Sequence, residues 1–267
     1  MDSILERTMW VDTSIDLMIH EIIEYDMKDG GLSIIKEEKL LPQKMIDKFD
    51  SLKKGIDRNA AIGKLRYSEK YKDIPKQQNE LFKKYRLLFG ELNELNDDDI
   101  QAVRKDAIFS KRYCYNLDIG SYIHFVEKNV YQVYAAIESK ALTGRRRIEF
   151  YWKEDGWVDV KGIEDKIINA YHRDYTIHVI SKVLRYIYRY DYKGAIKYLS
   201  KFLTQYKQRT LDAGYYRTFD AESVFPVIEE DGRQVIYNEM GPDKIMLLDI
   251  TFNYMMVYVP LVKLLSS

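Results

Sequence analysis

The spacing of apolar and polar residues changes along the chain and predicts an ordered series of strands and helices. Residues 1–25 predict a strand or short helix that leads into the apolar run IIEYD, and the Gly pair soon after Asp26 is typical of a tight turn. Between about residues 36 and 95 apolar residues recur every three or four positions among many charges. That spacing predicts surface helices around a modest core.

Strand-like segments follow this helical region. Three segments rich in Val, Ile and Tyr, with turn residues at their ends, predict hairpin strands over residues 100–112, 121–137 and 147–161. Residues 163–209 return to a helical pattern that is interrupted near YDYKGA (residues 190–195), and residues 225–237 (FPVIEEDGRQVIY) carry the Asp-Gly pair of a tight β-turn. Strand, helices, strands and helices in this order predict an α+β fold.

Composition narrows the class of protein. The chain of 267 residues is 46% hydrophobic and 13% aromatic, which is enough for a globular core. Its formal net charge is zero, so there is no general electrostatic case for a nucleic-acid or membrane partner. A single cysteine, Cys114, excludes an internal disulfide framework and favours the cytoplasm. The apolar stretch 244–265 contains Asp249, Asn253 and Pro260, so we expect a core segment there and no membrane span.

Two aspartates stand out because each ends or interrupts a strand-like apolar run. Asp26 ends the first run, and Asp106 interrupts the segment 100–112. Carboxylates on adjacent strand ends repel each other unless a divalent cation lies between them, as in phosphoryl-transfer sites that hold Mg²⁺. The alternative is that both are ordinary turn residues, a common position for Asp.

Basic and small residues follow on a predicted helix, over residues 53–65. Basic groups one helical turn apart can bind nucleotide phosphates, and small residues let a base pair approach the backbone. The candidates for nucleotide binding are Lys54, Arg58, Asn59 and Gly63. Further basic or aromatic groups occur at strand positions, namely Lys128, Tyr131 and Lys161. The alternative for residues 53–65 is an ordinary charged helix.

Five motifs, taken in order, resemble the palm domain of DNA polymerases, particularly the divergent family-B-like polymerases of bacteriophages. The resemblance covers roughly residues 20 to 165 and depends on the order of the motifs. The motifs are EYDMKDGGLSII, DRNAAIGKL, VRKDAIFSKR, EKNVY and VDVKGI. It implies a palm-like domain over residues 1–165 with a short helical, fingers-like insertion at 36–95. Residues 166–267 would then form a helical, thumb-like region with a hairpin and an apolar tail.

The resemblance also implies roles for individual residues. Asp26 and Asp106 would hold two Mg²⁺ ions, while Arg58 with Lys54, Asn59 and Gly63 would hold the nucleoside triphosphate. Lys128 and Tyr131 would contact primer and template, and Lys161 belongs to the last motif. The host cytoplasm would be the location of such a phage protein, with DNA favoured over RNA as its nucleic acid and a partner polymerase subunit as a further possibility.

The chain departs from the family pattern at three positions. Arg104 stands where family-B enzymes usually carry a second Asp, two residues before the catalytic one. Gly31 replaces the aromatic residue that excludes ribonucleotides, which puts sugar discrimination in doubt. Gly55 occupies the place of a nucleotide-binding Lys, with Lys54 one position away.

A basic, tyrosine-rich segment supplies an independent indication of nucleic-acid binding. Between residues 182 and 209 there are eight basic residues and one acid, Asp191. Basic residues at spacings of three and four would line one helical face if the helix runs through Gly194; they are Lys182, Arg185, Arg189, Lys193, Lys197 and Lys201. About 20 helical residues span about 30 Å, close to one turn of duplex. The alternative is a solvated basic face.

The sequence therefore favours a compact polymerase-like nucleotidyltransferase that uses two-metal phosphoryl transfer. A second hypothesis is a non-catalytic palm-fold subunit or regulator that binds nucleic acid or protein in a replication or transcription complex. A third is a phage protein that blocks a host function through a protein surface. Mg²⁺-dependent extension of a primed template separates the first hypothesis from the other two.

Overall fold

The computed structural model describes most of the chain. The described residues are 3–53, 56–139, 146–162, 173–208, 210–211, 227–230, 233–236 and 258–267. They form two compact units, of which unit 1 comprises residues 1–13 and 21–130, and unit 2 comprises residues 14–20 and 131–267. The division falls between Val130 and Tyr131, within one strand, whereas the sequence predicted a division after residue 165.

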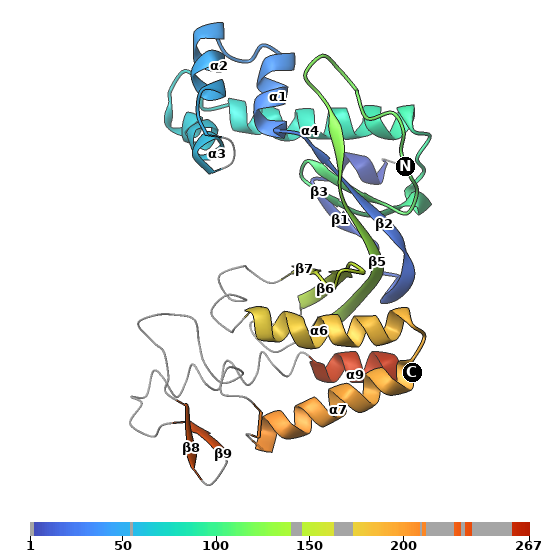
Figure 1. Ribbon diagram of the computed structural model, residues 1–267. Coiled ribbons are helices and arrows are strands. Elements are labelled where there is room, and N and C mark those ends of the chain that lie inside the picture. The colour runs from blue at the N-terminus through green and yellow to red at the C-terminus, as the bar shows by residue number, and fades with distance from the viewer. Residues whose placement is uncertain are drawn as a thin grey trace. The chain divides into compact units, whose positions relative to one another are not determined.

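The strands form a seven-stranded sheet in the order β1-β3-β4-β2-β5-β6-β7 (Figure 1). Their bounds are β1 Met9–Val11, β2 Leu17–Met27, β3 Ile100–Arg104, β4 Ala107–Ser110, β5 Phe125–Ser139, β6 Arg146–Trp152 and β7 Val158–Lys161. The recorded pairings are antiparallel. Together with the helices they make the fold α+β, as predicted.

In unit 1 four helices occupy the region where the sequence predicted them. They are α1 Gly30–Glu37, α2 Gln43–Asp50, α3 Ile56–Gly63 and α4 Ile74–Leu92. Helix α4 buries an apolar face of Phe82, Tyr85 and Phe89 against β2, β3 and β4. Helices α1, α2 and α3 share a second apolar cluster, which includes Ile35, Phe49 and Ile62.

A buried arginine attaches the start of unit 1 to α4. Arg86 donates from Nε to the carbonyl oxygen of Leu5 at 3.1 Å and from Nη2 to that of Arg7 at 2.6 Å. Burial lowers the pKa of Arg86 to about 10, while Asp106 favours its charged form. A Cβ at Gly90 would overlap the Leu5 side chain, so a glycine one turn further along α4 is what admits Leu5.

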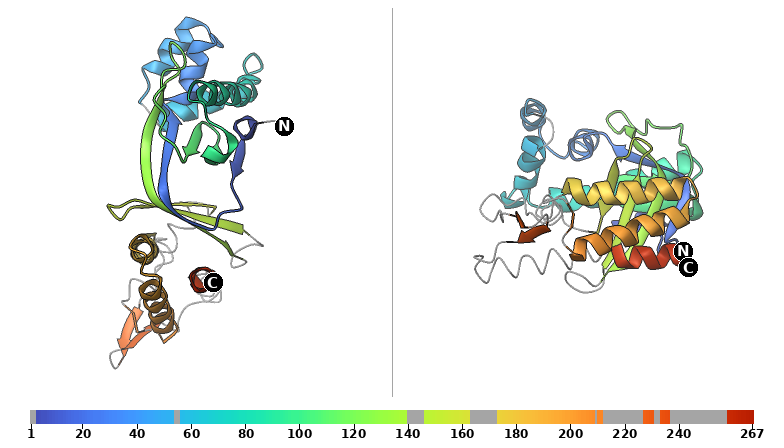
Figure 2. Two further views of the ribbon diagram at one scale, coloured as in Figure 1. Left: turned by 90° about the vertical axis from the view of Figure 1, so that its right-hand side faces the viewer. Right: turned by 60° about the horizontal axis from the view of Figure 1, so that its bottom comes forward.

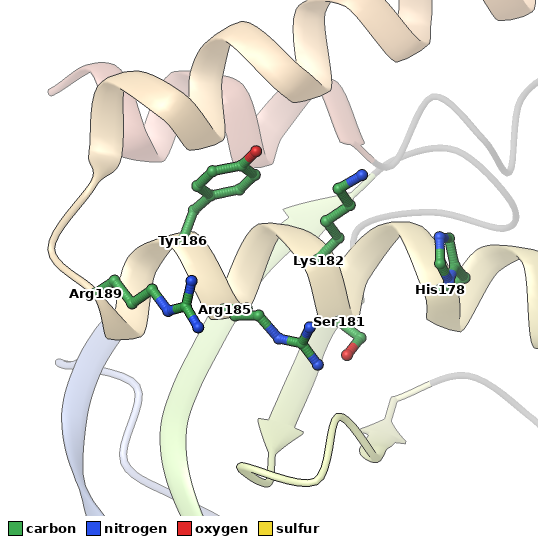
Figure 3. Close-up of a pocket in the computed structure, with 6 residues that line it drawn as sticks. All are labelled: His178, Ser181, Lys182, Arg185, Tyr186 and Arg189. Carbon is green, nitrogen blue, oxygen red and sulfur yellow. The ribbon is translucent and has the colours of Figure 1, made fainter.

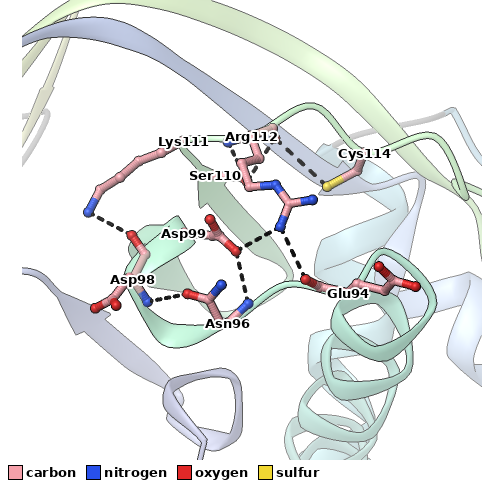
Figure 4. A network of polar contacts seen from close by, with 8 residues as sticks. All are labelled: Glu94, Asn96, Asp98, Asp99, Ser110, Lys111, Arg112 and Cys114. Atoms are coloured by element: carbon pink, nitrogen blue, oxygen red, sulfur yellow. Dashed lines mark hydrogen bonds and ion pairs between the residues drawn. The ribbon is translucent and has the colours of Figure 1, made fainter.

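The β3–β4 hairpin has a two-residue turn, Lys105–Asp106, in which Lys105 takes a positive φ of 48°. A polar network closes the other end of the hairpin (Figure 4). Asn96 caps the short 3-10 helix of residues 97–99 by accepting from the Asp98 N–H, and Asp99 accepts from the Asn96 N–H. Arg112 then pairs with Asp99 at 3.1 Å.

In unit 2 three helices pack with β5, β6 and β7 around one core, which contains Trp152, Leu184, Leu199 and Leu261. The helices are α6 Arg173–Tyr188, α7 Tyr192–Gln208 and α9 Tyr258–Ser266 (Figure 2). The predicted hairpin at 225–237 is confirmed as β8 Val227–Glu230 paired with β9 Arg233–Ile236. None of the described helices is both long enough and apolar enough to cross a membrane.

Candidate functional site

The sheet of unit 1 brings Asp26 next to Asp106. Asp26 lies near the end of β2, where it pairs with Ala107 at the start of β4. The N–H of Met27 donates to the carbonyl oxygen of Asp106 at 3.2 Å. The two aspartates that the sequence singled out, 80 positions apart, therefore lie on neighbouring backbone segments, and Asp106 occupies the hairpin turn as predicted.

Asp106 has an unusual electrostatic environment. Burial raises the pKa of its carboxyl group, and the negative charge of Asp26 raises it further. The positive charges of Lys105 and Lys128 act in the opposite direction. Two interacting carboxylates flanked by lysines favour any bound cation that relieves their repulsion, so the pair is a candidate metal-binding position.

The two aspartates open into a cavity of about 620 Å³ that lies wholly within unit 1. Its walls come from the end of β2, the first turn of α1, α3, α4, the hairpin turn and β5. The polar residues that line it are Asp26, Lys28, Asp29, Asn59, Gln78, Asn79, Lys105, Asp106 and Lys128. Three lysines and three aspartates therefore share one cavity, which suits an anionic ligand bound together with a cation.

Lys128 bridges two carboxylates at the edge of this cavity. Its Nζ donates to Asp26 Oδ2 at 2.9 Å and lies 3.4 Å from Glu24 Oε1. Burial lowers the pKa of Lys128, but the bond to Asp26 and the charges of both carboxylates outweigh it, so the pKa is raised overall. Lys128 therefore carries its positive charge beside Asp26.

Glycines shape the cavity wall where α1 begins. A Cβ at Gly30 would lie 2.9 Å from Phe82 Cε1 and 3.1 Å from Asp106 Oδ2, so a side chain there would displace one of them. At Gly31 a Cβ would meet only Gln78 Nε2 at 3.6 Å and Ile62 Cδ1 at 3.7 Å, which are ordinary contacts. Gly30 thus sets the position of Asp106, whereas Gly31 leaves space in the cavity.

The predicted nucleotide-binding residues have different positions. Asn59 and Gly63, on α3, line the cavity that also contains Asp26 and Asp106. Arg58 is not among the lining residues, because its guanidinium donates to three backbone carbonyl oxygens around the end of α2 (Phe49, Asp50 and Leu52) and lies 3.5 Å from Asp29 Oδ2. Its contacts make it a structural link between α2 and α3. Lys54 lies outside the described residues.

Tyr131 and Lys161 belong to unit 2. Tyr131 is 0% exposed and packs against Tyr151 and Trp157, so the predicted surface contact with primer and template is not available to its ring in this structure. Lys161 ends β7 and pairs with Asp159 at 2.6 Å. The sequence signal at Tyr131 was therefore a signal of core packing.

The basic residues after residue 181 do not form one helical face, because the interruption predicted near residues 190–195 is present. Helix α6 ends at Tyr188, Tyr190 takes a positive φ of 58°, and α7 begins at Tyr192. Asp191 caps α7 by accepting from the Gly194 N–H at 2.9 Å. Lys182 and Arg185 therefore lie on α6, Arg189 directly follows its end, and Lys193, Lys197 and Lys201 lie on α7.

The polar residues on the exposed face of α6, together with Arg189 just beyond its end, still form a continuous row, called here the basic row of α6. His178, Lys182, Arg185 and Arg189 follow one another at spacings of four, three and four along an exposed face, and they line a cavity of about 380 Å³ with Ser181 and Tyr186 (Figure 3). Among the described residues none of the four is paired with a carboxylate. The positive charges of Lys182, Arg185 and Arg189 along one exposed face suit an extended anion such as a phosphate backbone.

Sequence reasoning missed Glu24, Lys28, Lys105 and Gln78. Glu24 precedes Asp26 by two positions, so strand alternation could have placed both carboxylates on one face. Lys28 and Lys105 immediately neighbour predicted turns, whose geometry the residue pattern does not fix. Gln78 reaches the cavity through a bond from its Nε2 to the Gly31 carbonyl oxygen at 2.7 Å, a contact across 47 positions that no local pattern indicates.

The described residues contain no group of three or more His, Cys, Asp or Glu side chains that could hold a metal ion. The donor set at the cavity is a pair of carboxylates. Mg²⁺ is commonly held by one or two carboxylates together with substrate phosphates, so a pair is chemically sufficient for it.

Comparison with known proteins assigns the chain to a family. The sequence model of the protein family described as Bacteriophage PBS1 gene 130 protein matches residues 1–262 of the chain. The chain belongs to the bacteriophage PBS1 gene 130 protein family. A search of curated proteins found no significant match. The description of this family names a phage protein and no activity.

Proposed function

We propose that the unit 1 cavity is a nucleotidyl-transfer centre of the polymerase type, which joins a nucleoside triphosphate to the 3′ end of a nucleic acid. The observation that carries the proposal is the Asp26–Asp106 pair, with the raised pKa of Asp106 beside a charged neighbour. The motif order that resembles a family-B palm domain supports it, because the same two aspartates are the metal-binding residues of that pattern.

Asp26 and Asp106 would hold the Mg²⁺ ions. When bound, these ions would lower the pKa of the attacking 3′-hydroxyl and neutralise charge on the leaving pyrophosphate. The carboxylate pair fits such ions, since Mg²⁺ takes oxygen ligands and uses substrate phosphates to complete its shell. The partly buried position of Asp106 also restricts its carboxylate without the help of a ligand.

The lysines of the cavity would bind the triphosphate. Three lysines line the cavity, namely Lys28, Lys105 and Lys128, and the ammonium group of each can donate to phosphate oxygens. Asn59 and Gly63 lie on the α3 side, where a small residue leaves room for a base. Arg58, the residue that the sequence favoured for this role, is occupied by backbone carbonyl groups, so the lysines replace it in the proposal.

The basic row of α6 would bind the nucleic-acid backbone. Contacts of this kind depend on charge and are weakened by salt. We favour DNA over RNA as the nucleic acid, and nucleoside triphosphates as the second substrate. Gly31 leaves space where the resembling enzymes have an aromatic residue, so we expect weak discrimination between ribose and deoxyribose.

The deciding experiment supplies the protein with Mg²⁺, a primed template and labelled nucleotides. We expect extension by the wild type and its loss in Asp26→Asn and in Asp106→Asn. Glu80→Gln, an exposed acid on α4 outside the cavity, is the matched control and should extend like the wild type. Absence of extension by the wild type, or full extension by Asp106→Asn, would refute the proposal.

A second candidate function is a non-catalytic nucleic-acid-binding subunit or regulator of a replication or transcription complex. The observation that favours it is the Lys128 ammonium bound to Asp26, the place where a cation would otherwise lie. Arg104 in place of a second acid points in the same direction. Nucleic-acid binding that needs no Mg²⁺ and survives the Asp26→Ala/Asp106→Ala double change, without extension activity, would establish this alternative.

A further inference from the structure

We infer that Glu24 is a positioning residue that keeps the Lys128 ammonium at the cavity when Asp26 binds another cation. The inference rests on the proposed function, in which Asp26 is a metal ligand. It goes beyond that function because it assigns a role to Glu24, a carboxylate that does not line the cavity and to which the resemblance gives no role.

Glu24 is a buried carboxylate with fixed partners. Its side chain is only 5% exposed, and it lies on β2 two positions before Asp26. Its Oε2 accepts from the Asn129 Nδ2 at 2.6 Å, while its Oε1 lies 3.4 Å from the Lys128 Nζ. A buried charge is retained only when it is paired and hydrogen-bonded, so these two contacts hold Glu24 in place.

Lys128 is held by carboxylates that differ in accessibility. Asp26 is 26% exposed and lines the cavity, whereas Glu24 lies behind it and does not. The Lys128 side chain is itself 51% exposed, and its ammonium has three donors. Asp26 is therefore the partner that a cavity ligand can take from Lys128, and Glu24 is the partner that no cavity ligand reaches.

The consequence is a short exchange of partners. A divalent cation on Asp26 would displace the Lys128 ammonium from its nearest carboxylate. If Glu24 were absent, the ammonium would then have no carboxylate partner at the cavity and would turn to solvent. With Glu24 already 3.4 Å away, the ammonium keeps an ion pair and stays at the cavity edge, where it can donate to an anionic ligand. Glu24 thereby makes cation binding at Asp26 compatible with a lysine in the same place.

The first test needs no metal. Removal of the Asp26 charge in Asp26→Asn imitates the loss of that partner, and ¹⁵N relaxation of the Lys128 Nζ reports whether the ammonium is still held. We expect it to stay restricted in Asp26→Asn and to become as mobile as that of the exposed Lys44 in Glu24→Gln/Asp26→Asn. Equal mobility in the single and double variants would overturn the inference. Thermal unfolding verifies that each variant is folded.

The second test measures Mn²⁺ dissociation constants by electron paramagnetic resonance. Lys128→Met should tighten Mn²⁺ binding, and Glu24→Gln should weaken it by roughly tenfold, within the usual range of coupling between sites. Loss of the Glu24 negative charge would weaken Mn²⁺ binding even without a contact to Lys128, so a double-mutant cycle of Glu24 and Lys128 is needed to separate the two effects. In the Lys128→Met background Glu24→Gln should change the constant by less than about twofold, because the two residues act through one contact.

A control separates the contact from general charge. Glu127→Gln removes one negative charge from β5 at an exposed residue outside the cavity, and it should leave Lys128 mobility and Mn²⁺ affinity unchanged. If Glu24→Gln weakens Mn²⁺ binding equally with and without Lys128, Glu24 acts only by its own charge and the inference is wrong.

Failure of the inference and failure of the proposed function give different results. If Glu24 still holds Lys128 in Asp26→Asn but the wild type binds no Mn²⁺, the positioning role of Glu24 is supported and the metal site of the proposed function is refuted. If Asp26→Asn abolishes Mn²⁺ binding and by itself makes the Lys128 ammonium mobile, the metal site is supported and the positioning role of Glu24 is refuted.

Discussion

The N–H of Met27 donates to the carbonyl oxygen of Asp106 at 3.2 Å, and this single bond joins the end of β2 to the turn of the β3–β4 hairpin. Because Met27 directly follows Asp26, the bond also fixes the two carboxylates of the cavity on neighbouring backbone segments. Burial of Asp106 and the nearby negative charge of Asp26 raise the pKa of Asp106, so its ionised form is costly in the folded state.

We expect Asp106→Asn to stabilise the fold at neutral pH. The pKa of Asp106 is raised in the folded state, so its ionised form opposes folding at pH values above that pKa, and the penalty disappears below the pKa of the unfolded chain. The gain should be on the order of 1 kcal/mol at pH 7, the usual size for relieving a strained functional site. Urea unfolding at pH 7 and at about pH 3 measures it, and an equal gain at both pH values would contradict the explanation.

Gly30→Ala should destabilise unit 1 and displace Asp106. The new Cβ would lie 2.9 Å from Phe82 Cε1 and 3.1 Å from Asp106 Oδ2, and overpacking of this kind costs about 1–3 kcal/mol. Gly31→Ala is the matched control on the same helix, because its Cβ would make only ordinary contacts. Thermal unfolding of both variants is the measurement. The same loss in both would show that helix propensity, not the approach of Asp106, determines the result.

Arg58→Lys should lower stability with little direct effect on nucleotide affinity. The Arg58 side chain is 12% exposed, and a lysine cannot reproduce its bonds to the carbonyl oxygens of Phe49, Asp50 and Leu52. Loss of two such bonds should cost about 1–3 kcal/mol. Chemical unfolding gives the stability, and nucleotide titration gives the affinity. Unchanged stability with weakened nucleotide binding would instead assign Arg58 to the ligand.

Arg185→Gln and Arg189→Gln should each weaken nucleic-acid binding and reduce its salt dependence. Each arginine that contacts a phosphate contributes about one unit to the slope of log affinity against log salt concentration. Lys263→Gln, an exposed change on α9, is the control. Filter binding over a range of salt concentrations is the measurement. Slopes that stay the same in both arginine variants would separate the α6 row from phosphate binding.

The sequence predicted much of the chain where local pattern decides structure. The α+β class, the helical region before Asp97, the hairpin turn at Asp106 and the β8–β9 hairpin are all present. Each depends on spacing within a few residues, such as the Asp-Gly pair of the last hairpin. The proximity of Asp26 and Asp106 followed from their shared position at strand ends.

Long-range contacts account for what the sequence did not predict. The burial of Tyr131 depends on Tyr151 and Trp157, which come from β6 and from the turn that follows it. Partners of this kind are chosen by strand register, which local composition does not specify.

The bonds from Arg86 to Leu5 and Arg7 have a consequence for the order in which the protein is made. Their partners are separated by 81 and 79 positions, and the Asp26–Ala107 pair closes over a similar span. A growing chain on the ribosome therefore carries the first strand and Asp26 unpaired until α4 and the hairpin have been synthesised. The cavity takes shape only after most of unit 1 has emerged, so a nascent chain that has not yet reached Lys128 cannot contain the complete cavity.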